Sequence, residues 1–337
     1  MPKTQAVTIA EEFVQKINRE QRSLKLLNWA PLLVLLVMTI LFSLLAHESF
    51  PTVGNIINLL NQLSITLIIA MGLTFVTLIG SVDISVDGVV GLAGSVLSVL
   101  ILNSKNANDL GLIGVVIAVI LGGLFGFISG FVQVRFKVSS FMVTFGILSI
   151  ARGFAIMSYR GLFAEILDPM LMGIPSNSFF GIPLITWISL AVFGVAILIQ
   201  EKTPFGRHIY AVGTNEAIPR MTGINVDRVK VTAFVWSGIC LSIAGVIGAL
   251  RLGRGEVDIG MGQFFPAQAA VIIGGTSLSG GKGGVLNSLI GALIITVLNN
   301  GLLLLGVNTY IRTGVQGLII LVAIGLSVSH SRQAIVK

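Results

Sequence analysis

The sequence predicts an all-α polytopic bundle of about ten membrane-spanning helices, and three observations lead to this prediction. Hydrophobic residues make up 54% of the 337 residues and charged residues only 10%, whereas a soluble domain carries about 25% charged residues. The mean hydropathy is +0.97. Runs such as 32–45 and 111–131 contain no charged residue, and a helix needs about 20 predominantly apolar residues to cross a bilayer.

The apolar runs are separated by short polar segments, which set the expected spans and domain bounds. The eighth span is short, and the second and third are joined only by the sequence SVDISVDG. We expect 1–26 to be a cytoplasmic N-terminal segment, because it is polar and long, unlike a cleavable signal peptide. Residues 27–330 form the transmembrane domain and 331–337 a cytoplasmic tail. The expected spans are 27–46, 61–80, 88–103, 111–131, 139–158, 183–199, 231–250, 267–280, 285–305 and 313–329.

The Lys and Arg residues predict the orientation of these spans. Fifteen of the 21 lie on the side that holds both termini, which makes that side cytoplasmic by the positive-inside rule. The net charge of +7 therefore indicates membrane topology and no nucleic-acid partner. The other six are Lys105, Arg152, Arg160, Arg251, Arg254 and Arg312.

The glycine-rich stretch 274–284, GGTSLSGGKGG, invites comparison with a phosphate-binding loop. A Walker A loop requires G-x-x-x-x-G-K-[ST]. Here Thr276 stands five residues before Gly281, and Gly283 follows Lys282, so both required positions differ. We expect no nucleotide site, no catalytic or metal-binding residue and no cofactor. The single cysteine, Cys240, lies in an apolar run, where we expect it to be buried.

The same stretch resembles a segment in the first half of the chain. Residues 79–85 are IGSVDIS and residues 273–279 are IGGTSLS, and both follow an apolar run. Paired interruptions in two halves of a transporter indicate a substrate path. The alternative is two ordinary tight turns. The candidate path or gate residues are Asp83, Ser85, Gly274, Gly275, Thr276, Ser277 and Ser279.

Asp83 and Asp87 admit two interpretations. Carboxylates buried in a membrane are costly and usually functional. At the cytoplasmic rim, Ser85 or Asp87 would instead cap the helix expected to begin near Gly88.

The cytoplasmic loop 200–230 contains a candidate short helix. Asn215 suits its N-cap, Glu216 its first turn and Gly223 the position after its end. Ile218 and Met221 would form an apolar face for docking on a partner. The alternative is a solvated loop whose basic residues lie near anionic lipid.

Over residues 55–330, the sequence resembles the membrane permease of ribose-type ATP-binding-cassette (ABC) sugar importers. The resemblance rests on four segments: IGSVDISVDG; FKVSSFMVTFGILSIARG; TPFGRHIYAVGTNEA with GINV; and VIIGGTSLSGGKGGVLNSLIGALIITVLNNGLLLLGV.

The resemblance implies the fold, location and partners of such a subunit. It implies a multi-pass protein of the bacterial inner membrane, carrying a sugar-like solute and paired with a second permease copy or paralogue. Two cytoplasmic ATPase subunits, or a fused tandem ATPase, and an extracytoplasmic sugar-binding protein complete the importer. The segment that matches the family's coupling helix, which docks on the ATPase, comprises Gly213, Thr214, Asn215, Glu216, Ala217 and Gly223.

Three departures from the family pattern place the chain off the main ribose branch. Pro219 follows Ile218 in the coupling segment, where it disfavours helix at Ile218 and would delay or distort the helix. Phe264-Phe265-Pro266 replaces an acidic motif, and Asp87 replaces a glycine. The rival functions are an ion-coupled secondary transporter, using Asp83, Asp87 or Arg152, and a signalling or scaffold membrane protein.

Overall fold

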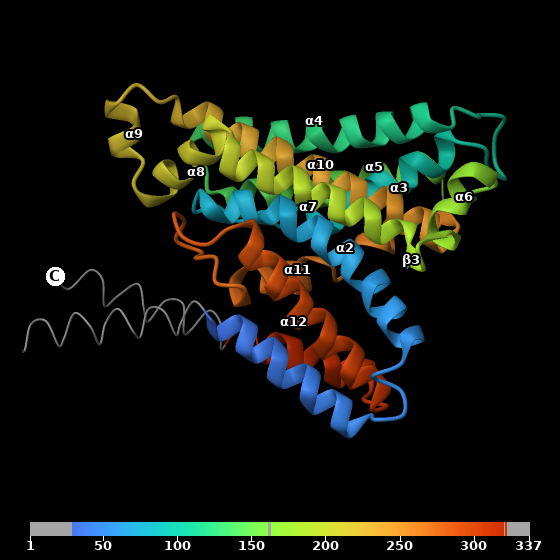
Figure 1. Ribbon diagram of the computed structural model, residues 1–337. Helices are drawn as coiled ribbons and strands as arrows, with labels where there is room; N and C mark the ends of the chain where they lie inside the picture. Colours follow the sequence, from blue (N-terminus) through green and yellow to red (C-terminus); the bar gives the residue numbers. More distant parts are fainter. Residues whose placement is uncertain (1–28, 161–162, 320, 322–337) are drawn as a thin grey trace, which may run out of the picture.

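The structure is a computed structural model that describes residues 29–160, 163–319 and 321. This part of the chain is almost entirely helical (Figure 1), which confirms the predicted all-α class. The predicted segments 1–26 and 331–337 lie outside it. The elements are a helix at Trp29–Leu45, α2 (Val53–Leu78), α3 (Val86–Leu100), α4 (Leu112–Phe136), α5 (Ser140–Tyr159), β1 (Ala164–Glu165), α6 (Pro169–Ser176), β2 (Ser178–Phe179), β3 (Ile182–Pro183), α7 (Leu184–Lys202), α8 (Pro204–Thr214), α9 (Ala217–Met221), α10 (Val226–Leu252), β4 (Arg254–Gly255), the 3₁₀ helix η1 (Val257–Gly260), α11 (Phe264–Ile273), α12 (Val285–Leu304) and a helix over 309–319.

Six of the described helices, α2, α4, α5, α7, α10 and α12, are long and apolar enough to cross a bilayer. Two others are too short to cross alone. α3 has 15 residues and α11 has 10, which give lengths of about 22 and 15 Å against a hydrocarbon core of about 30 Å.

The bounds predicted for the eighth span, 267–280, are wrong. α11 ends at Ile273, and the glycine-rich stretch forms a loop. The chain instead returns from the far end of α10 through the largely non-helical segment 253–263, which runs along α3. A Cβ on Gly91 would clash with the carbonyl of Val257, and a Cβ on Gly260 with that of Asp87. These glycines therefore allow the close approach that buries the segment against α3.

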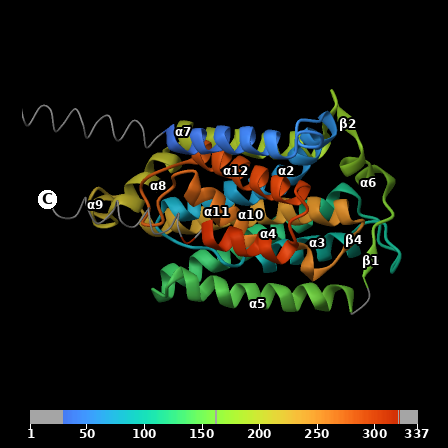
Figure 2. The ribbon, with the colours of Figure 1, turned by 90° about the horizontal axis from the view of Figure 1, so that it is seen from below.

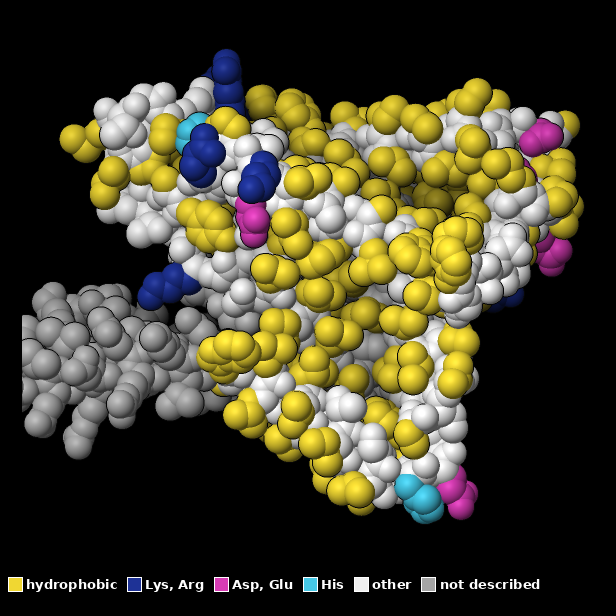
Figure 3. Space-filling model, viewed as in Figure 1, with side chains coloured by type: hydrophobic (Ala, Val, Ile, Leu, Met, Phe, Trp, Pro, Cys, Tyr) yellow, Lys and Arg dark blue, Asp and Glu magenta, His cyan; other side chains and the backbone are white. Residues whose placement is uncertain are grey.

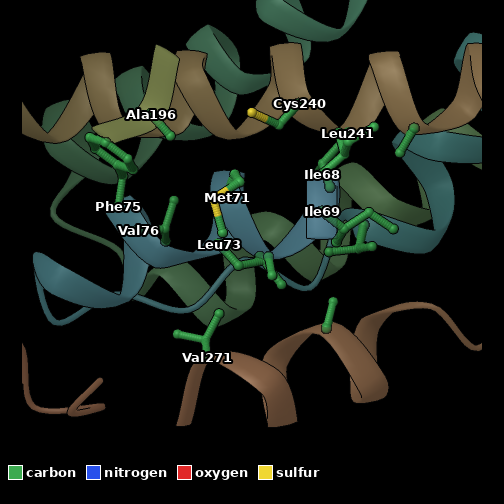
Figure 4. Close-up of a cluster of buried hydrophobic side chains, with 14 of the residues drawn as sticks. Ile68, Ile69, Met71, Leu73, Phe75, Val76, Ala196, Cys240, Leu241 and Val271 are labelled. Atoms are coloured by element: carbon green, nitrogen blue, oxygen red, sulfur yellow. The ribbon is translucent and has the colours of Figure 1, made fainter. Parts of the chain in front are cut away.

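The core of the bundle lies around α2, which contacts α7, α10, α11 and α12. Figure 4 shows its side chains between α10 and α11. Leu73, Phe75 and Val76 are completely buried, as is Cys240 of α10, as the sequence predicted. Burial of such side chains contributes about 1.5–3 kcal/mol each relative to exposure in water.

α4 and α10 pack at close range because glycines line their contact. A Cβ on Gly126 would clash with the carbonyl of Phe234, and a Cβ on Gly238 with that of Gly122. Gly122 and Gly126 are four residues apart on one face of α4, which is the small-residue spacing that lets membrane helices approach closely.

The two ends of the bundle differ. α8 and α9 lie at one end, and α6 with β1 and β4 lies at the other (Figures 1 and 2). Figure 2 shows α5 along one edge of the bundle, with α7 and the helix at Trp29–Leu45 at the opposite edge. On the face shown in Figure 3, Lys and Arg side chains gather at the α8–α9 end. The positive-inside rule expects this distribution if the α8–α9 end faces the cytoplasm.

Candidate coupling and translocation site

The two sequence-related loops, 79–85 and 274–284, meet at the α8–α9 end of the bundle. The backbone N–H of Gly281 donates a hydrogen bond to the carbonyl of Leu78 at 2.9 Å. A Cβ on Gly80 would lie 3.3 Å from the carbonyl oxygen of Ser279, and one on Gly280 would lie 2.8 Å from the backbone nitrogen of Gly80. We call this contact between the two loops the loop junction.

The loop junction is covered by α8, the helix that leads into the predicted coupling segment. Gly213 lies against both loops: a Cβ there would clash with the carbonyl of Leu78 and lie 2.6 Å from the nitrogen of Gly281. The hydroxyl of Tyr210 donates to the carbonyl of Gly283 at 2.8 Å. Burial, reinforced by the charge of Glu201, raises the pKa of Tyr210 above its ordinary value, which keeps that hydroxyl protonated.

A second hydrogen bond ties the end of α7 to the start of α12. The N–H of Val285 donates to the side-chain oxygen of Gln200 at 2.7 Å. This bond satisfies one of the donors that a helix N-terminus leaves unpaired. The coupling loop is therefore anchored to the second loop at two places, Gln200 and Tyr210.

Within the second loop, the predicted path residues hold the loop together. Thr276 is buried, and its hydroxyl oxygen accepts a hydrogen bond from the N–H of Gly284 at 3.2 Å. A Cβ on Gly274 would clash with the carbonyl of Asn287 in α12. The hydroxyls of Ser277 and Ser279 lie 2.8 Å apart.

Asp83 clamps the first loop to α10. Its carboxylate accepts hydrogen bonds from the backbone N–H of Ser85 at 3.0 Å, from the hydroxyl of Ser85 at 2.6 Å and from the hydroxyl of Ser237 at 2.8 Å. The side chain is 2% exposed. A buried carboxylate with three donors is satisfied where it stands, so its geometry is that of a structural clamp.

The predicted cap of α3 by Ser85 or Asp87 is wrong. Ser85 occupies the N-cap position but its hydroxyl turns to Asp83 and makes no capping bond. The carboxylate of Asp87 accepts from the N–H groups of Gly262 and Phe264, each at 3.0 Å. Asp87 therefore caps the start of α11, a helix far along the chain, and fixes segment 253–263 against α3.

The predicted short helix is present as α9 and is one turn long, with Glu216 as its N-cap in place of the expected Asn215. Asn215 accepts a hydrogen bond from the N–H of Ala217 at 2.9 Å, and Gly223 follows the helix with φ +81°. The expected delay or distortion of the helix is wrong, because α9 begins at Ala217, before Pro219. Pro219 lies in the first turn, where its missing N–H would have had no helical partner.

Ion pairs and an apolar face complete the coupling segment. Glu216 pairs with Lys230 of α10, and Arg220 pairs with Asp227 at 2.7 Å. Ile218 and Met221 are 61% and 87% exposed, as the docking interpretation requires. Beside them lies a groove of about 260 Å³. Its lining residues are Ala211, Thr214, Asn215, Ile218, Pro219, Thr222 and Ile224.

Comparison with known proteins identifies the family. The family described as "Branched-chain amino acid transport system / permease component" matches residues 55–324. The ribose import permease protein RbsC of Haemophilus influenzae is 38% identical, covering 86% of this chain and 90% of that protein. RbsC of Escherichia coli is 35% identical over 95% of this chain and 97% of its own length. The D-allose transport system permease protein AlsC of Escherichia coli is 32% identical, over 93% of this chain and 98% of its own length. No solved structure gives a significant match.

The chain belongs to this permease family. The resemblance to ribose-type ABC permeases is confirmed, and the permease is a multi-pass protein of the inner membrane. The comparisons favour an ABC importer subunit over an ion-coupled secondary transporter.

Sequence reasoning missed two parts of the permease's site. It did not predict α8, although Thr203 before Pro204 is a recognisable helix start, with the threonine side chain accepting from the N–H of Gly206 at 3.2 Å. It also did not predict that Asp87 would reach α11, since no local pattern indicates a contact between residues so far apart in sequence.

Proposed function

We propose that the permease forms the membrane pathway for a monosaccharide or a similar sugar-like solute. The similarity to the ribose and D-allose permeases supports this substrate class. Identity to the two ribose permeases, 38% and 35%, exceeds the 32% to the D-allose permease. Ribose is therefore the first solute to test.

The proposed assembly contains two permease chains, identical or paralogous, with two ATPase subunits or a fused tandem ATPase and an extracytoplasmic sugar-binding protein. The exposed pair Ile218 and Met221, beside an apolar groove, supports docking of α9 on the ATPase. The permease itself performs no covalent chemistry in this scheme, and ATP is hydrolysed in the ATPase subunits.

The loop junction is the observation that carries the mechanism. Movement of α9 on the closing ATPase displaces α8, and Gly213 transmits the displacement to Leu78 and Gly281 together. Leu78 ends α2 and Gly281 precedes α12, so a single movement of α8 would displace both halves of the chain. Loops 79–85 and 274–284 are the proposed gate. ATP binding then shifts the populations of inward-facing and outward-facing states.

The proposed topology has ten crossings with both termini in the cytoplasm. It counts the six long helices, the helix at Trp29–Leu45, α3, the segment 253–273 and the helix that begins at 309. In this scheme the largely non-helical part of 253–273 completes a crossing that α11 alone is too short to make.

Uptake in energised membrane vesicles tests the proposed function. The vesicles contain the permease with the ATPase and binding protein from its own transport system, and [¹⁴C]ribose, allose and arabinose are the probes. We expect uptake of at least one sugar that requires ATP and survives collapse of the proton and sodium gradients. Uptake that follows the ion gradients in the absence of ATP would contradict the proposal, as would substantial ATPase turnover by the purified permease alone.

A further inference from the structure

An ion pair lies on an accessible face between α5 and segment 253–263. Arg152 of α5 lies 3.5 Å from Asp258 of η1, measured between guanidinium nitrogen and carboxylate oxygen. The side chains are 42% and 59% exposed, respectively. The loop junction and the coupling segment use neither residue.

The pair lies within the depth that α5 spans. Arg152 is about 18 Å along the axis from the start of α5 at Ser140 and about 10 Å from its end at Tyr159. Asp258 lies at the same level, since the two charged groups are 3.5 Å apart. The α3 register agrees: Gly88 packs on Leu148 of α5, and Gly91, three residues further along α3, packs on Val257.

Hydrocarbon is an unfavourable surrounding for this face for two independent reasons. Charged side chains at membrane depth face a bundle interior or a water-filled cavity, since exposure to lipid is costly. Non-helical backbone at the same depth is tolerated only where it is buried in protein or lines a wet cavity. Met261 and Gly262, on the same accessible segment, are also exposed. The opposite side of α5 is apolar and exposed at Ile150, as expected for contact with lipid.

We propose that the face formed by Arg152 and segment 253–263 lines the solute path, with the Arg152–Asp258 pair as a binding site for a neutral polyhydroxylated solute. The inference rests on the proposed function. The guanidinium offers donors and the carboxylate offers acceptors, and a sugar hydroxyl can serve as both. An ion pair also balances its own charge, so it matches a solute that carries none. Interrupted helices near the midplane are the elements that hold solute in many transporters.

Thiol labelling tests whether this face is wet. The single cysteine of the permease, Cys240, is buried, so the unsubstituted chain provides a low background. Asp258→Cys and Met261→Cys place a thiol on the proposed path, and Ile150→Cys, 50% exposed on the opposite side of α5, is the matched control. Each full-length variant is assembled with its ATPase and treated in vesicles of both orientations with a charged, membrane-impermeant methanethiosulfonate reagent.

We expect Asp258→Cys and Met261→Cys to react at least tenfold faster than Ile150→Cys from one or both sides. Having two path variants guards against failure of one of them to fold. If neither folded path variant reacts from either side, the face is dry and the inference is overturned. If Ile150→Cys reacts as fast as the path variants, the face is no more accessible to water than the opposite side of α5, and the inference is also overturned.

Sugar uptake then tests the binding role. With ribose, allose and arabinose as probes, we expect Arg152→Gln and Asp258→Asn to lower the uptake rate at least tenfold at unchanged membrane abundance. Unchanged uptake in both variants would overturn the binding role. If the parent permease transports a sugar but the path thiols are unreactive, this inference fails and the proposed function stands. If the thiols react but no sugar is transported, the proposed function fails instead.

Discussion

The backbone N–H of Gly281 donates a hydrogen bond of 2.9 Å to the carbonyl of Leu78, which joins loops 79–85 and 274–284 at their ends. Gly213, at the end of α8, packs across this bond. The connection from α8 to both halves runs through the close backbone packing of Gly213, and the side chains of Gln200 and Tyr210 tie the same region to the second loop. Any side chain larger than a hydrogen atom at position 213 would push the Leu78 carbonyl and the Gly281 N–H apart.

Gly213→Ala should therefore impair transport. The added methyl group would clash with the carbonyl of Leu78, and overpacking of this kind costs about 1–3 kcal/mol. We expect sugar uptake to fall at least fivefold and the thermal unfolding midpoint in detergent to drop. Gly54→Ala is the control, because a Cβ at Gly54 meets nothing within 4 Å. Uptake by Gly213→Ala at the level of this control would contradict the proposed role.

Reversing the charge of Glu216 should uncouple ATP hydrolysis from transport. Glu216 pairs with Lys230 across the coupling segment, and Glu216→Lys would place two cations together. Because the pair is only partly exposed, 15% at Lys230 and 44% at Glu216, we expect some fall in the unfolding midpoint, but the main effect should be a large fall in sugar transported per ATP hydrolysed.

The double variant Glu216→Lys with Lys230→Glu separates two explanations. Recovery of coupling would show that the ion pair acts by holding α9 against α10. Persistent uncoupling with normal assembly would show that Glu216 contacts the ATPase directly. Normal coupling in the single Glu216→Lys variant would show that Glu216 has no role in coupling.

Asp83 should matter for stability more than for solute binding. Its carboxyl group accepts three hydrogen bonds in a buried site, and leaving a buried donor unpaired costs about 1–3 kcal/mol. We expect Asp83→Ala to lower the free energy of unfolding by about 2–4 kcal/mol. Asp83→Asn, which keeps one acceptor oxygen, should lose less and retain uptake.

Ser237→Ala is the matched partner for Asp83, because it removes a single donor from α10. The effects of Asp83→Ala and Ser237→Ala should be less than additive in chemical denaturation, since both remove the same bond. Loss of uptake in a fully stable Asp83→Asn variant would instead assign Asp83 to the solute path.

Asp87 should anchor the interrupted crossing. Its carboxylate accepts from Gly262 and Phe264 at the start of α11, and loss of a helix cap costs about 1 kcal/mol. We expect Asp87→Ala to destabilise the permease by about that amount and to increase hydrogen exchange at residues 260–266. Asp109→Ala, an exposed acidic residue in the loop before α4, is the control for loss of charge. Unchanged exchange at residues 260–266 would contradict the anchoring role.

The sequence determined the class of the permease because hydropathy and charge are properties of composition that no packing can reverse. The charge-free runs around 32–45 and 111–131 fold as helices. Gly223 correctly marked the position just past the end of the short helix α9, whereas the N-cap of α9 is Glu216, one residue after the expected Asn215. These are local signals, carried by a side chain and the backbone beside it.

The tertiary structure decided what the polar residues do, because that depends on partners far along the chain. Asp83 reaches Ser237 of α10 and Asp87 reaches Phe264 of α11, and neither distant partner could be predicted from the local sequence. The bounds of the eighth expected span were wrong for the same reason: an extended segment such as 253–263 has no periodic pattern, and its packing on α3 is a contact between residues far apart in sequence. The related loops 79–85 and 274–284 were recognisable as a pair, but their contact through Leu78 and Gly281 required the folded chain.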